Sequence, residues 1–279
     1  MLPNFLIIGT EKGGTTWLYE QLRAHPNVYL PPTKEPHFFN QYDSNLTSDT
    51  NWHRGLEYYR RLFRKHDGEA AVGEATPMYL CDPEAPGRIK ETLDEVRLIC
   101  LLRDPVDRAY SHYWMARRKG HTDESFDDVV AERDERFIER GRYGAQLERY
   151  LEWFPREFFG QPDEHLADIC EFLQIDPEPV VTSNRLEESE NSSSVIRSKY
   201  LHRLIGFVAT KMRRTRGFDW LLDEVKRLGL ADAIKDLNRS PEEYPEMSEA
   251  HRRELSVYYE STCERVESFL DRSVEVWGR

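Results

Sequence analysis

The stretch Asn4-Phe-Leu-Ile-Ile-Gly-Thr-Glu-Lys-Gly-Gly-Thr-Thr-Trp-Leu-Tyr19 decides the fold of this chain. Its apolar run at residues 5–8 is typical of a strand that is buried on both faces of a sheet. A glycine-bearing loop follows at residues 9–14, and a helix is predicted from Thr15 onward. Such a strand, loop and helix form a phosphate cradle, because free backbone N–H groups and the positive end of the helix dipole face the anion.

The loop differs from the ATP-binding P-loop in the place of its lysine. That motif has a glycine, four residues, a second glycine, a lysine and then a serine or threonine. Gly9 and Gly14 have this spacing, but Thr15 stands where the lysine belongs, and the lysine of the loop is Lys12. Without the Lys-Ser/Thr pair there is no obvious magnesium ligand. The loop therefore indicates an anion other than a magnesium-bound triphosphate.

A second apolar strand, predicted at residues 96–102, runs into Arg103-Asp-Pro-Val-Asp-Arg-Ala-Tyr-Ser111. Arg103 offers a planar, bidentate fork to a phosphate group. Ser111 lies two turns into the predicted helix and adds a hydroxyl group. Strand, helix and strand in this rhythm predict a parallel sheet, in which ligands bind at the carboxyl ends of the strands. Both phosphate motifs fall at that edge.

These two motifs resemble those of sulfotransferases that use 3'-phosphoadenosine 5'-phosphosulfate (PAPS). Lys12-Gly-Gly-Thr-Thr-Trp17 is similar to the loop for the 5'-phosphosulfate, and Arg103 with Ser111 is similar to the 3'-phosphate motif. The resemblance implies PAPS as cofactor, PAP as product and no metal. Later segments similar to family loops add Arg197 and Arg239. The implied cofactor-binding residues are Lys12, Gly13, Gly14, Thr15, Thr16, Trp17, Arg103, Ser111, Arg197 and Arg239.

The segment Pro31-Pro-Thr-Lys-Glu-Pro-His-Phe-Phe39 is a proline-stiffened loop. Carbohydrate-type sulfotransferases carry Glu-x-x-Phe-Phe here, so the resemblance implies that Glu35 is the catalytic base. His37 is the alternative base, or a group that positions the substrate. The resemblance also makes Lys12 the cation that stabilises the leaving phosphate. The implied catalytic residues are thus Lys12, Glu35 and His37.

The segment Glu74-Ala-Thr-Pro-Met-Tyr79 follows a short predicted strand. It resembles the family segment that lines the acceptor cleft. Glu74 and Tyr79 are therefore candidate substrate-binding residues, together with Glu35 and His37. The alternative is a plain strand end followed by a proline turn.

The length of 279 residues accommodates one large α/β domain or two small ones. We expect a single P-loop-like domain over residues 1–279, with a central, mainly parallel sheet flanked by helices. Residues 1–115 would form the PAPS-binding core, and residues 116–279 a mostly helical remainder that includes a charged helix over 125–140. After Phe159 the family has a further strand, but here the chain enters a predicted helix almost at once. Either residues 157–159 supply a short strand, or the sheet loses one.

Composition narrows the location and the partners. The net charge of −12 argues against non-specific binding of nucleic acid. There is no run of eighteen apolar residues, and no basic leader precedes the first strand, so we expect no membrane span and a cytoplasmic location. The four cysteines are scattered, which fits a reducing compartment.

The expected reaction is in-line transfer of a sulfuryl group from PAPS to a hydroxyl or amine of an acceptor. The resemblance favours a carbohydrate-like acceptor, and a glycolipid or small metabolite is the alternative. A P-loop nucleotide kinase is a second reading of the same cradle, and Thr15 argues against it. A degenerate protein that binds PAP without turnover is a third. It is favoured by the short region after Phe159 and by the absence of the family's Lys-Gly-Arg near Arg239.

Overall fold

The structure is a computed structural model, and it describes most of the chain in two compact units. The described residues are 1–44, 46, 50–93, 95–155, 159–160, 166–177, 194–196, 239–241, 244–271, 273–274 and 277. The first unit comprises residues 1–112, 125–188 and 248–279, and the second comprises residues 113–124 and 189–247. The second unit contains an antiparallel pair, β6 (Ser194–Ile196) and β7 (Arg239–Pro241).

Strand β1 (Phe5–Gly9) lies at the centre of a five-stranded sheet in the first unit, in the order β2-β3-β1-β4-β5. Every pair of neighbouring strands in this sheet is parallel. All five residues of β1 are buried, as expected of a strand that is covered on both faces. The remaining strands are β2 (Val28–Tyr29), β3 (Ala71–Ala75), β4 (Arg97–Cys100) and β5 (Phe159–Gly160). The predicted parallel sheet is confirmed.

The strand expected after Phe154 is present in the sheet, but it is short. Strand β5 has two residues, and Leu98 of β4 pairs with Phe159 while Ile99 pairs with Gly160. Of the two alternatives, the structure therefore contains the short strand, which begins at the last residue of the predicted span.

Helices flank this sheet on both faces. The α-helices of the described residues are α1 (Thr15–Arg23), α2 (Gly55–Leu62), α3 (Ala85–Thr92), α4 (Pro105–Arg118), α5 (Phe126–Ala131), α6 (Tyr143–Leu151), α7 (Leu166–Leu173) and α12 (Glu249–Leu270). The same part of the chain contains the short 3-10 helices η1 (Trp52–Arg54), η2 (Pro77–Tyr79) and η3 (Glu139–Gly141).

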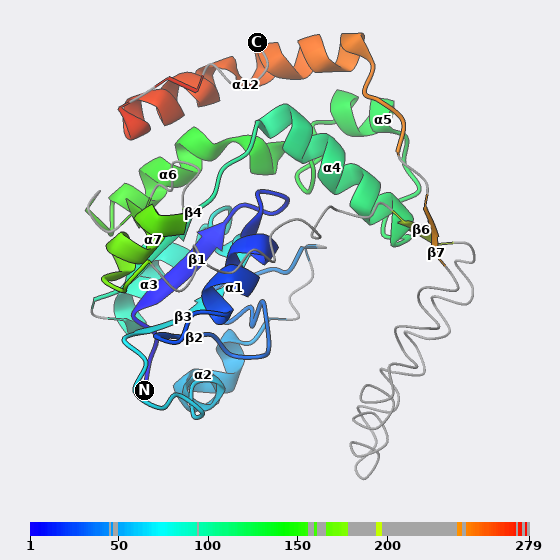
Figure 1. Cartoon of the computed structure of the whole chain (residues 1–279). Helices are drawn as coiled ribbons and strands as arrows, with labels where there is room; N and C mark the ends of the chain where they lie inside the picture. The colour runs from blue at the N-terminus through cyan, green and yellow to red at the C-terminus, as the bar shows by residue number, and fades with distance from the viewer. Residues whose placement is uncertain are drawn as a thin grey trace. The chain divides into compact units, whose positions relative to one another are not determined.

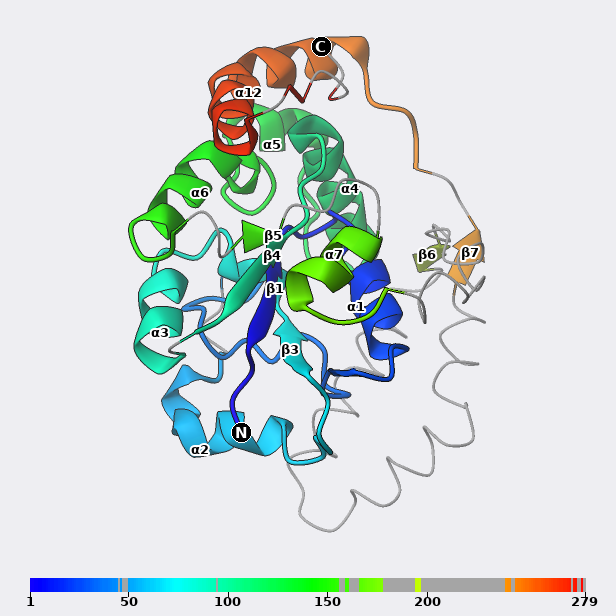
Figure 2. The same cartoon turned by 60° about the vertical axis from the view of Figure 1, so that its left-hand side comes forward.

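The two faces of β1 meet different helices, because successive side chains of a strand point to opposite sides. Leu6 and Ile8 belong to a hydrophobic cluster with residues of α2, α3, α6 and α12. Phe5 and Ile7 belong to a second cluster with residues of α1 and α7. Figures 1 and 2 show α1 and α7 on one side of the sheet and α3 and α6 on the other. This layering leaves the carboxyl ends of β1, β3 and β4 at one edge, where ligands bind in such sheets.

The charged helix predicted over residues 125–140 is wrong in its length. Helix α5 begins with a capping box, in which Ser125 and Asp128 bind each other's backbone N–H, and it ends at Ala131. Arg133 adopts a left-handed φ of 53°, which an α-helix does not allow. The Asp134 carboxylate then accepts a hydrogen bond from the backbone N–H of Arg136, so the chain turns toward η3.

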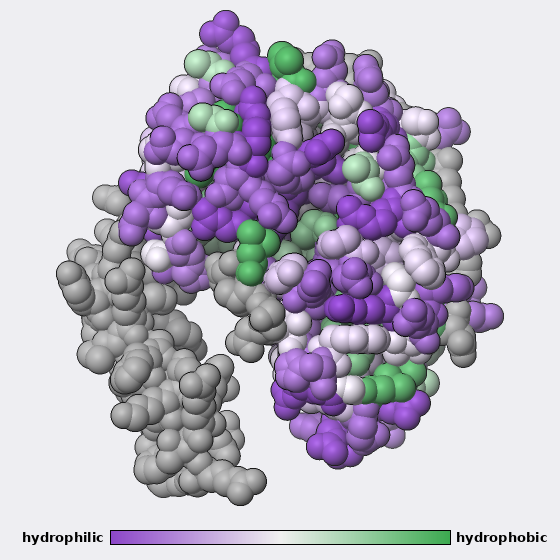
Figure 3. Space-filling view, turned by 180° about the vertical axis from the view of Figure 1, so that it is seen from behind, coloured by the Kyte–Doolittle hydropathy of each residue, from purple (hydrophilic) through white to green (hydrophobic). Residues whose placement is uncertain are grey.

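The surface of the described residues is largely polar on the face shown in Figure 3. Figure 3 shows one face of the described residues, with hydrophilic side chains over most of it and apolar ones scattered singly. A chain with 32% charged residues is expected to look this way. Among the described residues, no helix is long and apolar enough to cross a membrane.

Candidate active site

The glycine loop is held against the end of β4. The backbone N–H of Thr10 donates to the carbonyl of Leu101 at 2.7 Å. Gly13 approaches the same carbonyl so closely that a Cβ atom there would lie 2.7 Å from its oxygen. Gly14 is the N-cap of α1 with φ 95°, a conformation that favours glycine, and no side chain caps the helix. The first-turn N–H groups of α1 are thus left for a ligand or water.

The two predicted phosphate motifs meet at this loop. Arg103 follows β4, and its Nη1 donates to the backbone carbonyl of Lys12 at 3.4 Å. Ser111 lies on α4 in the same unit and is 9% exposed. Lys12 itself has a left-handed φ of 67°, which turns the chain inside the loop. The arginine and the loop lysine therefore lie on neighbouring segments, as the sequence predicts.

The two threonines and the tryptophan that follow the loop differ in how far they are buried. Thr15 is 4% exposed, whereas Thr16 is exposed on the first turn of α1. Trp17 is half-buried and packs against the cluster on the α1 side of the sheet. Arg239 lies in β7 of the second unit, and Arg197 lies outside the described residues. The cofactor-binding roles of Arg197 and Arg239 therefore stay predictions.

Lys34 joins the glycine loop to the predicted base. Its Nζ lies 2.8 Å from Oγ1 of Thr16 and 2.8 Å from Oε1 of Glu35. Glu35 adopts a left-handed φ of 57°, and its backbone N–H donates to the carbonyl of Ala75 at the end of β3. The carboxylate is about one-third exposed, so it is held in place and still accessible.

His37 lies on the other side of the Glu35 carboxylate. Its Nε2 is 3.8 Å from Oε2 of Glu35, and its Nδ1 is 3.1 Å from Nδ2 of Asn40. An amide nitrogen can only donate, so the neutral ring accepts at Nδ1 and carries its proton on Nε2, toward Glu35. The two candidate bases thus lie side by side, at a separation longer than a hydrogen bond.

Glu74 and Tyr79 lie beneath this loop. Glu74 is 1% exposed and accepts hydrogen bonds from the hydroxyl groups of Tyr79 (2.6 Å), Thr76 (2.7 Å) and Tyr59 (3.1 Å). The Tyr79 hydroxyl also accepts from the backbone N–H of Phe38. Burial raises the pKa of Glu74 to about 7, although the three hydroxyl donors oppose that shift.

This placement corrects the prediction that Glu74 and Tyr79 contact the substrate. Both side chains are buried, so in this structure they offer an acceptor no surface. The buried aromatic layer around Phe38 explains the difference, because the segment after Glu35 folds over them. They hold the base-bearing loop from below.

A buried ion pair supports the loop from the side of α6. The Glu11 carboxylate lies 2.7 Å from Nη1 of Arg140 and accepts a hydrogen bond from the Ser44 hydroxyl at 2.8 Å. Burial opposes its charge, but the nearby cations prevail and lower the pKa of Glu11. His112 lies 3.8 Å from the same carboxylate, and burial lowers its pKa to about 3.

Sequence reasoning assigned no role to Lys34, Glu11 or Arg140. Lys34 had a signal, since it precedes the predicted base in a loop stiffened by prolines. Glu11 and Arg140 are 129 positions apart, and no local pattern joins them. Among the described residues, no group of three or more His, Cys, Asp or Glu side chains is arranged to hold a metal ion.

A glycine loop between a buried strand and a helix N-terminus, with an arginine at the end of the neighbouring strand, is the arrangement that α/β proteins use for phosphorylated ligands. The sulfotransferase domain family matches residues 2–264, which is nearly the whole chain. The chain therefore belongs to the sulfotransferase family.

Two relatives and one solved structure agree with this assignment. The membrane-associated sulfotransferase kil1 of Dictyostelium discoideum is 38% identical over 140 residues, which are 47% of this chain and 28% of that protein. Heparan sulfate glucosamine 3-O-sulfotransferase 3A1 of Mus musculus is 37% identical over 163 residues, which are 55% and 39% of the two chains. The matches thus cover well under half of either relative. A sulfotransferase from Alicyclobacillus acidocaldarius has a TM-score of 0.69 at 26% identity, over the full length of both chains.

Proposed function

We propose that this chain is a PAPS-dependent sulfotransferase that sulfates a hydroxyl or amine of a carbohydrate-like acceptor. The observation that carries the proposal is the position of Lys34. This residue connects Thr16, on the first turn after the glycine loop, to the Glu35 carboxylate. A cradle for an anionic donor and a base for an acceptor are thereby held next to each other.

The residues at the loop fit PAPS. The first turn of α1 has no side-chain cap and no acidic residue, so its N–H groups suit the 5'-phosphosulfate. In the proposed role, Lys12 and the N–H groups of Gly13 and Gly14 would surround that group. Arg103 and Ser111 would hold the 3'-phosphate. PAPS supplies the sulfuryl group when it is bound.

Two side chains would carry the transfer. Lys12 stabilises negative charge that develops on the phosphate oxygen to which the sulfuryl group was attached. Glu35 takes the proton from the attacking acceptor atom, and its exposed fraction of about one-third leaves it within reach of solvent and acceptor. In this proposal His37 lies beside the Glu35 carboxylate, with its Nε2 3.8 Å from Oε2, and is not itself the base.

Calorimetric titration with PAP tests the donor site. We expect PAP to bind wild-type protein, and Arg103→Ala to weaken binding about 10- to 100-fold, which is the loss of a charge-assisted hydrogen bond. Lys12→Ala should abolish most turnover. Arg253→Ala, an exposed arginine of α12, serves as the matched control. ATP with magnesium is the control ligand.

Three results would contradict the proposal. Absence of PAP binding would overturn it. Binding of ATP only with magnesium would favour a kinase. PAP binding without turnover on a broad acceptor panel would favour a protein that keeps the nucleotide site without the reaction.

A further inference from the structure

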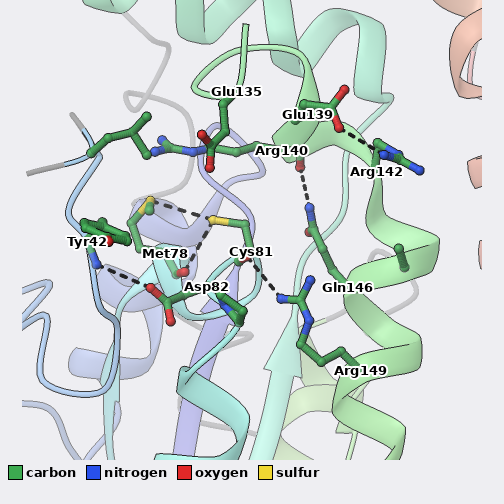
Figure 4. A pocket seen from close by; sticks show the side chains of 13 residues that line it. Tyr42, Met78, Cys81, Asp82, Glu135, Glu139, Arg140, Arg142, Gln146 and Arg149 are labelled. Atoms are coloured by element: carbon green, nitrogen blue, oxygen red, sulfur yellow. Dashed lines mark hydrogen bonds and ion pairs between the residues drawn. The ribbon is translucent and has the colours of Figure 1, made fainter. Parts of the chain in front are cut away.

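A cavity of about 240 Å³ in the first unit has no role in the reaction described so far (Figure 4). Its wall comes from the segment after Asn40, the segment after Tyr79 and the stretch from Glu135 to α6. The lining residues are Tyr42, Leu46, Met78, Cys81, Asp82, Pro83, Glu135, Glu139, Arg140, Arg142, Ala145, Gln146 and Arg149.

The segments that form the cavity also carry the transfer site. Asn40, the partner of His37, donates through Nδ2 to the carbonyl of Tyr42 at 2.5 Å. Arg140 binds Glu11, the residue before Lys12. Met78 and Cys81 belong to the segment that follows Glu74. The cavity wall is therefore connected to the base-bearing loop through Asn40 and to the glycine loop through the Arg140–Glu11 pair.

Two buried polar side chains of the wall have an atom without a partner. Nη2 of Arg140 and Oε1 of Gln146 are buried and make no hydrogen bond in the part of the chain that the structure describes. Both side chains are about 5% exposed or less. Leaving this donor and this acceptor unpaired costs free energy, so a turn of either side chain toward the cavity would be stabilised by a ligand group that accepts or donates a hydrogen bond. A sugar hydroxyl group does both.

The formal charges of the wall cancel, because its three carboxylates (Asp82, Glu135 and Glu139) stand with three arginines (Arg140, Arg142 and Arg149). Arg142 pairs with Glu139 at 3.0 Å, and Arg140 pairs with Glu11. Both oxygens of the Asp82 carboxylate accept hydrogen bonds from backbone N–H groups, among them that of Gln41 at 2.6 Å. Arg149 donates a hydrogen bond to the backbone carbonyl of Cys81. A polyanion would meet three carboxylates of the wall, whose charges the three arginines already balance. The wall therefore favours a neutral ligand.

The mouth of the cavity adds an apolar surface. Tyr42 is 39% exposed, and Leu46 is 36% exposed. Figure 4 shows Tyr42 and Met78 across the cavity from Gln146 and Arg149. An aromatic and apolar wall facing a few hydrogen-bonding groups is the usual design of a site for a small organic ligand.

We infer that this cavity binds a neutral, polyhydroxylated part of the acceptor, such as an unsulfated sugar ring. The inference rests on the proposed sulfotransferase function and narrows its acceptor class. A neutral acceptor would distinguish this chain from sulfotransferases that act on a sulfated polyanion.

Saturation-transfer NMR on the full chain in the presence of PAP tests the inference. The neutral probes are glucose, galactose, mannose, N-acetylglucosamine, cellobiose and trehalose, and the anionic probe is a heparin-derived tetrasaccharide. We expect at least one neutral probe to bind. Tyr42→Ala and Gln146→Leu should each weaken its binding about 3- to 10-fold, the loss of one ring contact or one hydrogen bond. The matched controls, Tyr58→Ala and Gln21→Leu, lie outside the cavity wall and should leave binding unchanged.

The outcomes separate the inference from the function on which it rests. If PAP binds and no neutral probe does, or if the tetrasaccharide binds in preference, the inference is overturned and the sulfotransferase proposal stands. If a neutral probe binds equally well to wild type and Tyr42→Ala, the cavity is not its site; Tyr42 is exposed, so its loss does not threaten the fold. If PAP does not bind at all, the proposed function fails first.

Discussion

The ammonium nitrogen of Lys34 lies 2.8 Å from the side-chain oxygen of Thr16, on the first turn of the helix that follows the glycine loop. The same nitrogen lies 2.8 Å from the Glu35 carboxylate. One cation thus fixes the distance between the segment that would hold the donor and the group that would activate the acceptor. Such positioning matters because transfer requires the reacting atoms to be aligned within a fraction of an ångström.

Replacement of Lys34 by methionine should therefore lower kcat more than it changes PAP affinity. We expect a loss on the order of 10- to 100-fold in kcat, since small misplacements of catalytic groups have effects of this size. Lys34→Arg should recover part of the loss. Steady-state kinetics and PAP titration measure the two effects, with Lys90→Met on α3 as the matched control. A fall in PAP affinity with kcat unchanged would show that Lys34 binds the donor and does not position the base.

Replacement of Glu35 by glutamine separates the two candidate bases. The amide cannot take a proton, so we expect kcat to fall by about 10²- to 10⁴-fold. His37→Gln should cost less, because it leaves the Glu35 carboxylate in place. Glu57→Gln, on the exposed face of α2, is the control. If His37→Gln is the more damaging substitution, the histidine is the base and the roles are reversed.

The glycine loop and the sheet could be predicted because their signals are local. A continuous apolar run at residues 5–8, a fixed glycine spacing and an arginine at a strand end all lie within short windows. The register was not predictable in this way, and that of β1 with β4 shifts between Ile7 and Gly9. The proximity of Glu35 and His37 could also be predicted, because only one residue separates them in a loop stiffened by prolines.

The support beneath the site could not be predicted from local patterns. Tyr59 and Glu74 are 15 positions apart, and Glu11 and Arg140 are 129 apart, so each contact depends on how the helices cover the sheet. Glu74 illustrates the consequence. Its sequence context suggested a cleft residue, but the packing of Phe38 and Phe39 above it makes it a buried acceptor. The end of α5 depended on the left-handed conformation of Arg133, for which the sequence has no glycine signal.

The pKa of Glu74 makes stability depend on pH. Burial raises it from its ordinary value of 4.5 to about 7, so between these values the folded state holds a proton that the unfolded state has released. The free energy of unfolding should therefore fall as pH rises from 4.5 to 7, by on the order of 3 kcal/mol from this group. Glu74→Gln imitates the protonated form and should remove this slope.

Urea unfolding of wild type and Glu74→Gln at pH 5, 6, 7 and 8 measures the effect. The two proteins should have similar stability at pH 5, and the variant should be the more stable at pH 8. Glu91→Gln, an exposed residue of α3, controls for a general effect of charge. Parallel curves for wild type and Glu74→Gln would mean that the three hydroxyl donors keep Glu74 ionised throughout.

The ion pair between Glu11 and Arg140 yields the last prediction. Arg140→Met would leave a buried carboxylate next to the glycine loop without its cation, which typically costs about 3–5 kcal/mol. Glu11→Gln in the same chain removes the stranded charge, so the double variant should recover much of that loss. Urea unfolding of the wild type, both single variants and the double variant completes the double-mutant cycle and isolates the coupling free energy between Glu11 and Arg140.

The control is Arg133→Met, which breaks a more exposed ion pair with Glu254 and should cost at most about 1 kcal/mol. Equal losses in Arg140→Met and Arg133→Met, or strict additivity in the cycle, would mean that the buried pair does not stabilise the loop. Because Glu11 precedes Lys12, we also expect Arg140→Met to weaken PAP binding and the double variant to restore it in part.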